Sequence, residues 1–64
     1  MAAMDRINAQ LAASGLPIRV TKLSEPHQGP SVYYRAHVAP LGKPEAGRFN
    51  HVIEEQKDGS FRIY

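Results

Sequence analysis

Apolar residues near the start of the chain recur at the spacing of an amphipathic helix. Met4, Ile7 and Leu11 lie three and four positions apart, so a helix would place their side chains on one face. This stripe predicts a helix over residues 5–14 with Asp5 as its N-cap. Residues 1–4, at the start of the chain, are expected to be disordered.

The residues that follow predict how this helix ends. Gly15 can adopt the left-handed backbone conformation of the C′ position, and Pro17 cannot continue a helix. Leu16 would stand at C″ and Leu11 at C3, the two positions that an apolar contact joins in a Schellman motif. Both leucines are therefore expected in the core.

Two segments after the helix alternate apolar and polar residues with the period of a strand. In residues 17–23, Ile18 and Val20 share one face, whereas Leu23 has the opposite parity, which indicates a twist or a bulge. Residues 31–39 are the strongest predicted strand, and loops rich in proline and glycine follow each of these strands. One face of residues 31–39 carries Val32, Tyr34, Ala36 and Val38, and the other carries Tyr33, Arg35 and His37.

Residues 48–64 predict a β-hairpin whose turn chemistry selects the register. A two-residue turn at Asp58-Gly59 would place glutamates beside the apolar residues of the last strand. A three-residue loop puts Gly59 at the left-handed position and pairs Gln56 with Ser60. The hydrophobic match favours the longer loop, because a slip of one residue would turn every side chain to the other face. The pairs expected are Ile53 with Ile63, Glu55 with Phe61, Glu54 with Arg62, and Val52 with Tyr64.

The order of elements predicts an α+β fold in which an N-terminal helix packs on one face of a four-stranded antiparallel sheet, an α-β-β-β-β meander. Short connections favour antiparallel neighbours, and a single helix can cover one face only. Residues 1–64 are expected to form one small domain. Its predicted core is Ile7, Leu11, Leu16, Ile18, Val20, Val32, Tyr34, Ala36, Val38, Phe49, Ile53, Phe61 and Ile63.

Composition excludes several classes of protein. The chain has 64 residues and no cysteine, so it can form neither disulfides nor a cysteine-type zinc site, and its core is small. No apolar run approaches the ~18 residues that span a bilayer, and we expect a cytoplasmic protein without membrane attachment. The net charge of +2 permits nucleic-acid binding without implying it.

Residues that could support catalysis or metal binding are scattered. His27, His37 and His51 lack the local spacing of a metal site. Glu54 and Glu55 are adjacent on a predicted strand and would point to opposite faces, so they do not form a carboxylate pair. The glycines mark turns rather than a phosphate-binding loop. We therefore expect no enzyme activity, no metal and no cofactor.

Residues 11–43, LAASGLPIRVTKLSEPHQGPSVYYRAHVAPLGK, resemble part of a double-stranded RNA-binding domain. The shared features are a helix that ends in Gly-Leu-Pro, a strand, a His-containing Gly-Pro loop and a second strand, over about half of the chain. The Ser-Lys-Lys helix start with which that family grips phosphates has no counterpart here. A hairpin with two glutamates takes its place, so the family is not assigned.

One face of the predicted sheet has no helix to cover it, and we call it the open face. Its residues are Arg19, Tyr33, Arg35, His37, Asn50, Val52, Glu54, Arg62 and Tyr64. Tyrosine and arginine are enriched at protein interfaces, and they also suit stacking on bases and pairing with phosphates. A merely solvated face is the alternative. The predicted binding residues are Arg19, Tyr33, Arg35, His37, Arg62 and Tyr64.

The last strand, residues 60–64, is a second candidate surface, because an edge without proline or lysine invites pairing with another chain. We expect a non-enzymatic module that acts by protein–protein contact, as a small regulator, inhibitor or subunit. It would use the open face or the edge strand, and a homodimer formed there would enlarge the small core. The alternative is a nucleic-acid-binding module that uses the same basic and aromatic face.

Overall fold

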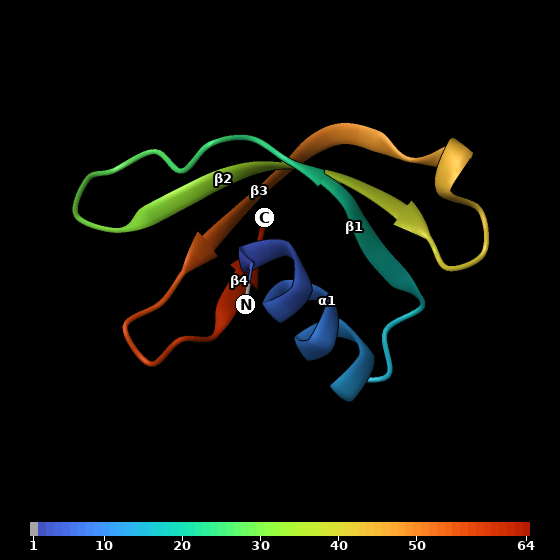
Figure 1. Ribbon diagram of the computed structural model, residues 1–64, viewed down its shortest axis with the longest axis horizontal. Coiled ribbons are helices and arrows are strands. Elements are labelled where there is room, and N and C mark those ends of the chain that lie inside the picture. The colour runs from blue at the N-terminus through green and yellow to red at the C-terminus, as the bar shows by residue number, and fades with distance from the viewer. Residues whose placement is uncertain (1) are drawn as a thin grey trace.

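One helix packs beneath a sheet of four antiparallel strands. The elements are α1 (Ala3–Ala13), β1 (Ile18–Leu23), β2 (Val32–Pro40), the 3₁₀ helix η1 (Pro44–Ala46), β3 (Arg48–Glu55) and β4 (Phe61–Ile63). The computed structural model describes residues 2–64, without the side chains at positions 48–50. The strand order is β1-β2-β3-β4, which confirms the predicted meander. Figure 1 shows the sheet curving around α1, so the face away from the helix is convex.

Helix α1 begins earlier than its apolar stripe predicted. The N-cap is Ala2, which makes no side-chain capping bond, so the assignment of Asp5 as N-cap was wrong. Asp5 lies instead in the first helical turn, where a carboxylate is stabilised by the positive end of the helix dipole. The expectation of disorder was wrong for Ala3 and Met4, which are helical because alanine favours helix and the Met4 side chain packs against the core.

The end of α1 is the predicted Schellman motif. Gly15 has a φ of 71°, and the Leu16 N–H donates to the Leu11 carbonyl at 3.1 Å. The side chain of Leu16 was nevertheless placed wrongly, because it is 43% exposed rather than in the core. The backbone bonds close the motif, while Leu16 lies at the corner where the chain leaves α1 for β1.

The hairpin has the register that the turn residues predicted. Ile53 pairs with Ile63, Glu54 with Arg62 and Glu55 with Phe61. The Tyr64 N–H donates to the Val52 carbonyl at 2.8 Å, and the Gln56 N–H donates to the Ser60 carbonyl at 2.8 Å. Gly59 has a φ of 89°, which is the left-handed conformation that a three-residue loop requires.

A β-bulge in β1 explains the change of parity along that strand. Val20 pairs with Val38 and Lys22 pairs with His37, so Thr21 is the extra residue. Leu23 thereby returns to the side of the sheet that faces α1 and packs against the core. The bulge also turns Lys22 to the open face, opposite His37.

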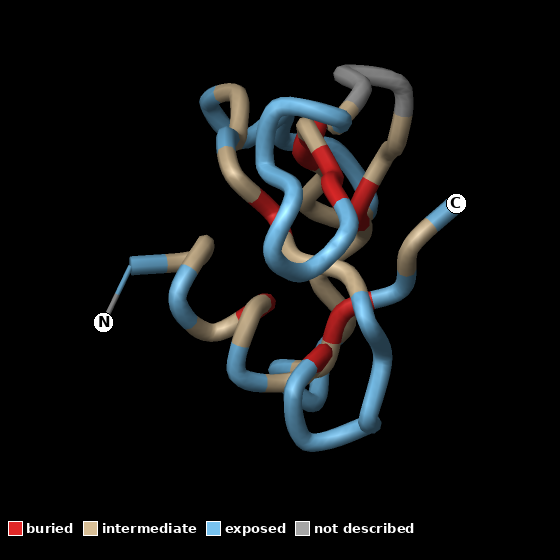
Figure 2. The backbone as a smooth tube through the Cα atoms, turned by 90° about the vertical axis from the view of Figure 1, so that its right-hand side faces the viewer, coloured by how far each residue is buried: buried red, intermediate tan, exposed pale blue. Residues whose placement is uncertain are grey.

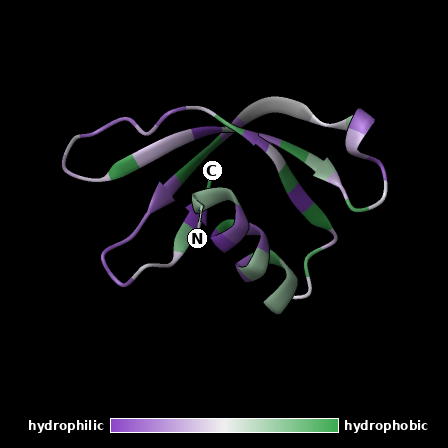
Figure 3. Cartoon of the chain, in the orientation of Figure 1, coloured by the Kyte–Doolittle hydropathy of each residue, from purple (hydrophilic) through white to green (hydrophobic). Residues whose placement is uncertain are grey.

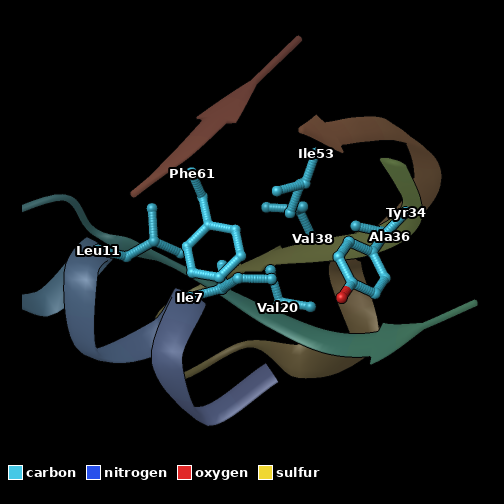
Figure 4. Close-up of a cluster of buried hydrophobic side chains, with 8 residues drawn as sticks. All are labelled: Ile7, Leu11, Val20, Tyr34, Ala36, Val38, Ile53 and Phe61. Carbon is cyan, nitrogen blue, oxygen red and sulfur yellow. The ribbon is translucent and has the colours of Figure 1, made fainter. Parts of the chain in front are cut away.

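The core lies between α1 and the concave side of the sheet. Figure 4 shows its side chains converging from the helix and all four strands, and Figure 2 shows the loops around it exposed. Figure 3 shows hydrophobic and hydrophilic stretches alternating along α1 and the strands, as expected for elements with one buried side. The buried cluster is Ile7, Leu11, Val20, Tyr34, Ala36, Val38, Ile53 and Phe61, with Ile18, Val32 and Ile63 partly buried against it. The predicted core residue Phe49 lies outside the described side chains.

Two side-chain amides fasten α1 to both edges of the sheet. The Asn8 amide donates to the Val20 carbonyl at 2.9 Å and accepts from the Val20 N–H at 2.7 Å. The Gln10 amide forms the same pair of bonds with Phe61 in β4, at 2.9 Å each. Each amide therefore takes the place that a neighbouring strand would occupy at that residue.

Candidate functional site

Six side chains form two rows on the convex face of the sheet. The strand register aligns Tyr33, Glu54 and Arg62 in one row, and Arg35, Val52 and Tyr64 in the next. We call these six residues the two-row patch. Arg35, Arg62 and Tyr64 are exposed, and Tyr64 is the most accessible ring, with 59% of its surface exposed. The patch therefore combines two tyrosines and two arginines on one accessible surface.

Glu54 is the centre of hydrogen bonding in the patch. The Tyr64 hydroxyl donates to Glu54 Oε1 at 3.0 Å. Hydrogen bonds from the side chains of Ser31, Tyr64 and Tyr33 lower the pKa of the Glu54 carboxyl, and the positive charge of Arg62 lowers it further. The carboxylate is thus ionised at neutral pH and accepts the Tyr64 hydroxyl.

Two cations of the convex face, one in the patch and one beside it, have no partner among the described residues. Lys22 and Arg35 are both exposed. Within the described part of the chain, neither side chain takes part in a hydrogen bond or ion pair, and the ion pair formed there is Arg6 with Glu55 at 3.4 Å. The charge of Arg62, in contrast, is balanced by Glu54 in the opposite strand. An excess of positive charge therefore lies over β1 and β2.

The other end of the convex face is covered by the segment around η1. A Cβ atom at Gly47 would lie 2.8 Å from the Cβ of Ala39 and even closer to the His37 ring. Ala39 is only 2% exposed for this reason, although it lies on the convex face. The His37 ring is hydrogen-bonded to the Thr21 hydroxyl beneath this segment. His37, a predicted binding residue, is thus partly covered, although it neighbours Arg35 of the two-row patch on the same strand.

Arg19 is separated from the patch, because its guanidinium binds the main chain nearby. It donates to the Leu16 carbonyl at 2.8 Å and to the Ile18 carbonyl at 2.6 Å. Of the six predicted binding residues, the structure brings together Tyr33, Arg35, Arg62 and Tyr64.

Sequence reasoning missed Lys22 as a residue of the open face. Strict alternation from Val20 would place it toward the core, but the bulge at Thr21 reverses its direction. One signal in the sequence could have located Lys22. Leu23 is apolar but out of step with Ile18 and Val20, and a bulge that returns Leu23 to the core side also turns Lys22 to the open face. Sequence reasoning also treated Glu54 only as the partner of Arg62, whereas its carboxylate also accepts the Tyr64 hydroxyl.

The β4 edge is less available for pairing than its sequence indicated. The Gln10 amide forms hydrogen bonds with both the N–H and the carbonyl of Phe61, which face outward from the sheet. The alternation of an antiparallel ladder leaves Ile63 as the other outward-facing residue of this three-residue strand. A partner strand would therefore have to displace α1 or bind to a very short edge.

A shallow hollow of about 450 Å³ borders the patch at one end of β2 and β3. It is lined by Pro30, Ser31, Val32, Glu54, Glu55, Gln56 and Lys57. Glu55 turns toward the helix side, where it accepts a bond from the Tyr34 hydroxyl at 3.4 Å. Among the described residues there is no group of three metal-ligating side chains.

Comparisons with protein-family models, with curated proteins and with solved structures found no match for this chain. Within residues 2–64, no helix is long and apolar enough to cross a membrane.

Proposed function

We propose that this chain is a non-enzymatic, cytoplasmic binding module that contacts a partner protein through the two-row patch. The observation that carries the proposal is the attachment of Tyr64 to Glu54, at 3.0 Å between hydroxyl and carboxylate, with Tyr33 directly opposite Glu54 in the neighbouring strand. A ring held in this way, as Tyr64 is, loses little rotational freedom when a partner packs on it. Tyrosine and arginine are also the residues that contribute most at protein interfaces.

The shape of the patch supports contact with a large partner. The sheet curves around α1, so the patch lies on a convex surface (Figure 1). Small-molecule sites are usually concave. The shallow hollow lies at the edge of the patch, and Glu54, one of the residues that line it, already binds the Tyr64 hydroxyl. A small regulator, inhibitor or subunit would use such a surface to cover part of another protein.

Binding of nucleic acid is the second candidate. Lys22, Arg35 and Arg62 share the convex face and would attract phosphates. The ionised Glu54 in the middle of the patch opposes this use, because it would repel a phosphate over the tyrosine rings. We therefore rank nucleic acid below a protein partner.

The proposal is tested by affinity capture from a nuclease-treated extract of the source cells, followed by mass spectrometry. The immobilised wild-type chain is compared with a Tyr33→Ala/Arg35→Ala variant. The matched control is Leu41→Ala/Lys43→Ala, which removes an exposed apolar residue and an exposed cation from the loop before η1. Circular dichroism verifies that both variants fold.

A protein that the wild type and the control retain, and the patch variant loses, is the expected result. Equal retention by all three chains would show that the patch is not the binding surface. Light scattering of the purified chain distinguishes a second copy from a different protein as the partner. A dimer that the patch variant dissociates would make the chain its own partner.

A further inference from the structure

We propose that the partner of the two-row patch is an acidic protein segment, whose carboxylates pair with Arg35 and Lys22 while its apolar side chains pack on Val52 and Tyr64. This inference rests on the proposed function and adds the chemistry of the partner. It follows from the uneven distribution of charge across the convex face.

The side of the face over β1 and β2 is positive and unbalanced. Arg35 and Lys22 are exposed, and among the described side chains neither has an anionic partner. Both lie on the convex face, because Lys22 opposes His37 and Arg35 is two residues from His37 in β2. This side of the face therefore lacks the negative charge that would complement it.

The side over β3 and β4 is balanced and partly apolar. Glu54 lies opposite Arg62 in the next strand, so their charges offset each other, and Glu54 Oε1 accepts the Tyr64 hydroxyl. Val52 and Tyr64 follow in the second row, joined by a main-chain bond of 2.8 Å. A partner needs no charge here, and its apolar side chains can pack against the valine and the exposed ring.

The spacing of the two free cations fits an extended chain. Residues that are diagonal neighbours across two strands, such as Lys22 and Arg35, are about 7–8 Å apart. In an extended peptide, side chains two positions apart lie on the same side and are separated by roughly 7 Å. A segment with Asp or Glu at alternate positions would therefore present one carboxylate to each cation.

A peptide fits this surface better than a nucleic acid does. Every nucleotide carries a phosphate, so a strand that crosses the patch would bring negative charge to the ionised Glu54 as well as to Arg35. A peptide can carry acidic residues on the side of β1 and β2 and uncharged residues on the side of β3 and β4. The carboxylate at the centre of the patch thus selects against a uniform polyanion.

The test measures fluorescence anisotropy with a fluorescein-labelled peptide of repeating Glu-Leu-Glu-Ser as the probe. The same peptide with lysine in place of glutamate, and a labelled single-stranded oligonucleotide of similar length, serve as comparisons. The protein variants are Arg35→Glu, Lys22→Glu and Lys43→Glu. Lys43→Glu is the matched control, because it makes the same change of charge at an exposed lysine in the loop before η1, outside the two-row patch.

We expect the wild type to bind the acidic peptide and not the lysine peptide, with an affinity that falls as salt is raised. Arg35→Glu and Lys22→Glu should each weaken binding at least tenfold, and Lys43→Glu less than twofold. No binding of the acidic peptide, or equal loss with all three variants, would overturn the inference. Tighter binding of the oligonucleotide that depends on Arg35 would overturn it in favour of nucleic acid.

Failure of this inference is distinguishable from failure of the proposed function. If affinity capture finds a partner that depends on Tyr33 and Arg35 while the acidic peptide does not bind, the patch is the binding surface and only the acidic chemistry is wrong. If capture is insensitive to the patch and the peptide also fails to bind, both proposals are wrong.

Discussion

The side-chain amide of Gln10 forms two hydrogen bonds with the main chain of Phe61, one to its carbonyl and one from its N–H, at 2.9 Å each. These bonds join α1 to the strand at the other end of the chain. They also satisfy the outward-facing groups of Phe61 on an edge strand of only three residues. A strand as short as β4 is held in place because the helix supplies bonds that a fifth strand would otherwise provide.

The Gln10→Ala substitution should lower the free energy of unfolding by about 1–3 kcal/mol, because a partly buried donor and acceptor of Phe61 lose their partners. Urea denaturation followed by circular dichroism measures the change. Gln28→Ala removes the same side chain from an exposed loop position and should change stability by less than about 0.5 kcal/mol. Equal effects of the two substitutions would show that the amide bonds to Phe61 contribute no stability.

Gly47→Ala should lower the free energy of unfolding by about 1–3 kcal/mol, because its methyl group would overlap the Cβ of Ala39 and the ring of His37. The backbone conformation is not the cause, since the φ of Gly47 is −74°, which alanine accepts. Thermal unfolding measures the loss. Gly29→Ala is the control, because its methyl group would meet only the Ser31 carbonyl oxygen, at 3.7 Å.

The same overlap predicts coupling between Gly47 and His37. Truncation of the ring by His37→Ala removes its bond to Thr21, but it also makes room for a methyl group at position 47. The double variant should therefore be more stable than the sum of the two single effects implies. If the double variant loses as much free energy of unfolding as the two single variants together, the close approach of Gly47 to the His37 ring is contradicted.

Glu54 should make stability fall in acid. Bonds from Ser31, Tyr64 and Tyr33 hold the folded pKa of Glu54 below its usual value of 4.5, so the folded state binds fewer protons than the unfolded chain near that pH. The stability that ionised Glu54 contributes to the folded state is fully present above pH 4.5 and is lost as the pH falls through the lowered pKa. Urea denaturation of the wild type at pH 6 and at pH 3 should reveal this loss.

Asp58 also has a lowered pKa, caused by bonds from the side chain and main chain of Ser60, so it too makes stability fall in acid. The Glu54→Gln variant separates the effect of Glu54 from that of Asp58. The variant should lose less stability than the wild type between pH 6 and pH 3. Glu25→Gln, at an exposed loop position, should follow the wild type. If Glu54→Gln loses as much stability between pH 6 and pH 3 as the wild type does, the hydrogen bonds to Glu54 do not stabilise its charged carboxylate.

Local patterns along the chain were sufficient to predict the element order, the meander and the hairpin register. The end of α1 followed from Gly15, and the turn of the hairpin followed from Gly59, because both residues have the positive φ that glycine accepts most readily. The pairing of Ile53 with Ile63 then followed from the two-residue period of a strand. Each of these features is decided by residues close together in the sequence or by one alternating pattern.

The composition of the binding surface was decided by contacts and by one bulge that strict alternation does not take into account. Parity alone put Arg19 and His37 with the tyrosines, but main-chain carbonyls bind Arg19 and the Gly47 segment covers His37. A single bulge at Thr21 added Lys22 to the face.

The attachment of Gln10 to Phe61 and of Tyr64 to Glu54 spans 51 and 10 positions. No local pattern encodes these contacts, because they depend on how the packed elements approach one another in space. Alternation along a strand assigns each side chain to a face of the sheet. Only the folded chain determines which side chains on that face bind other groups of the same protein and which remain available to a binding partner.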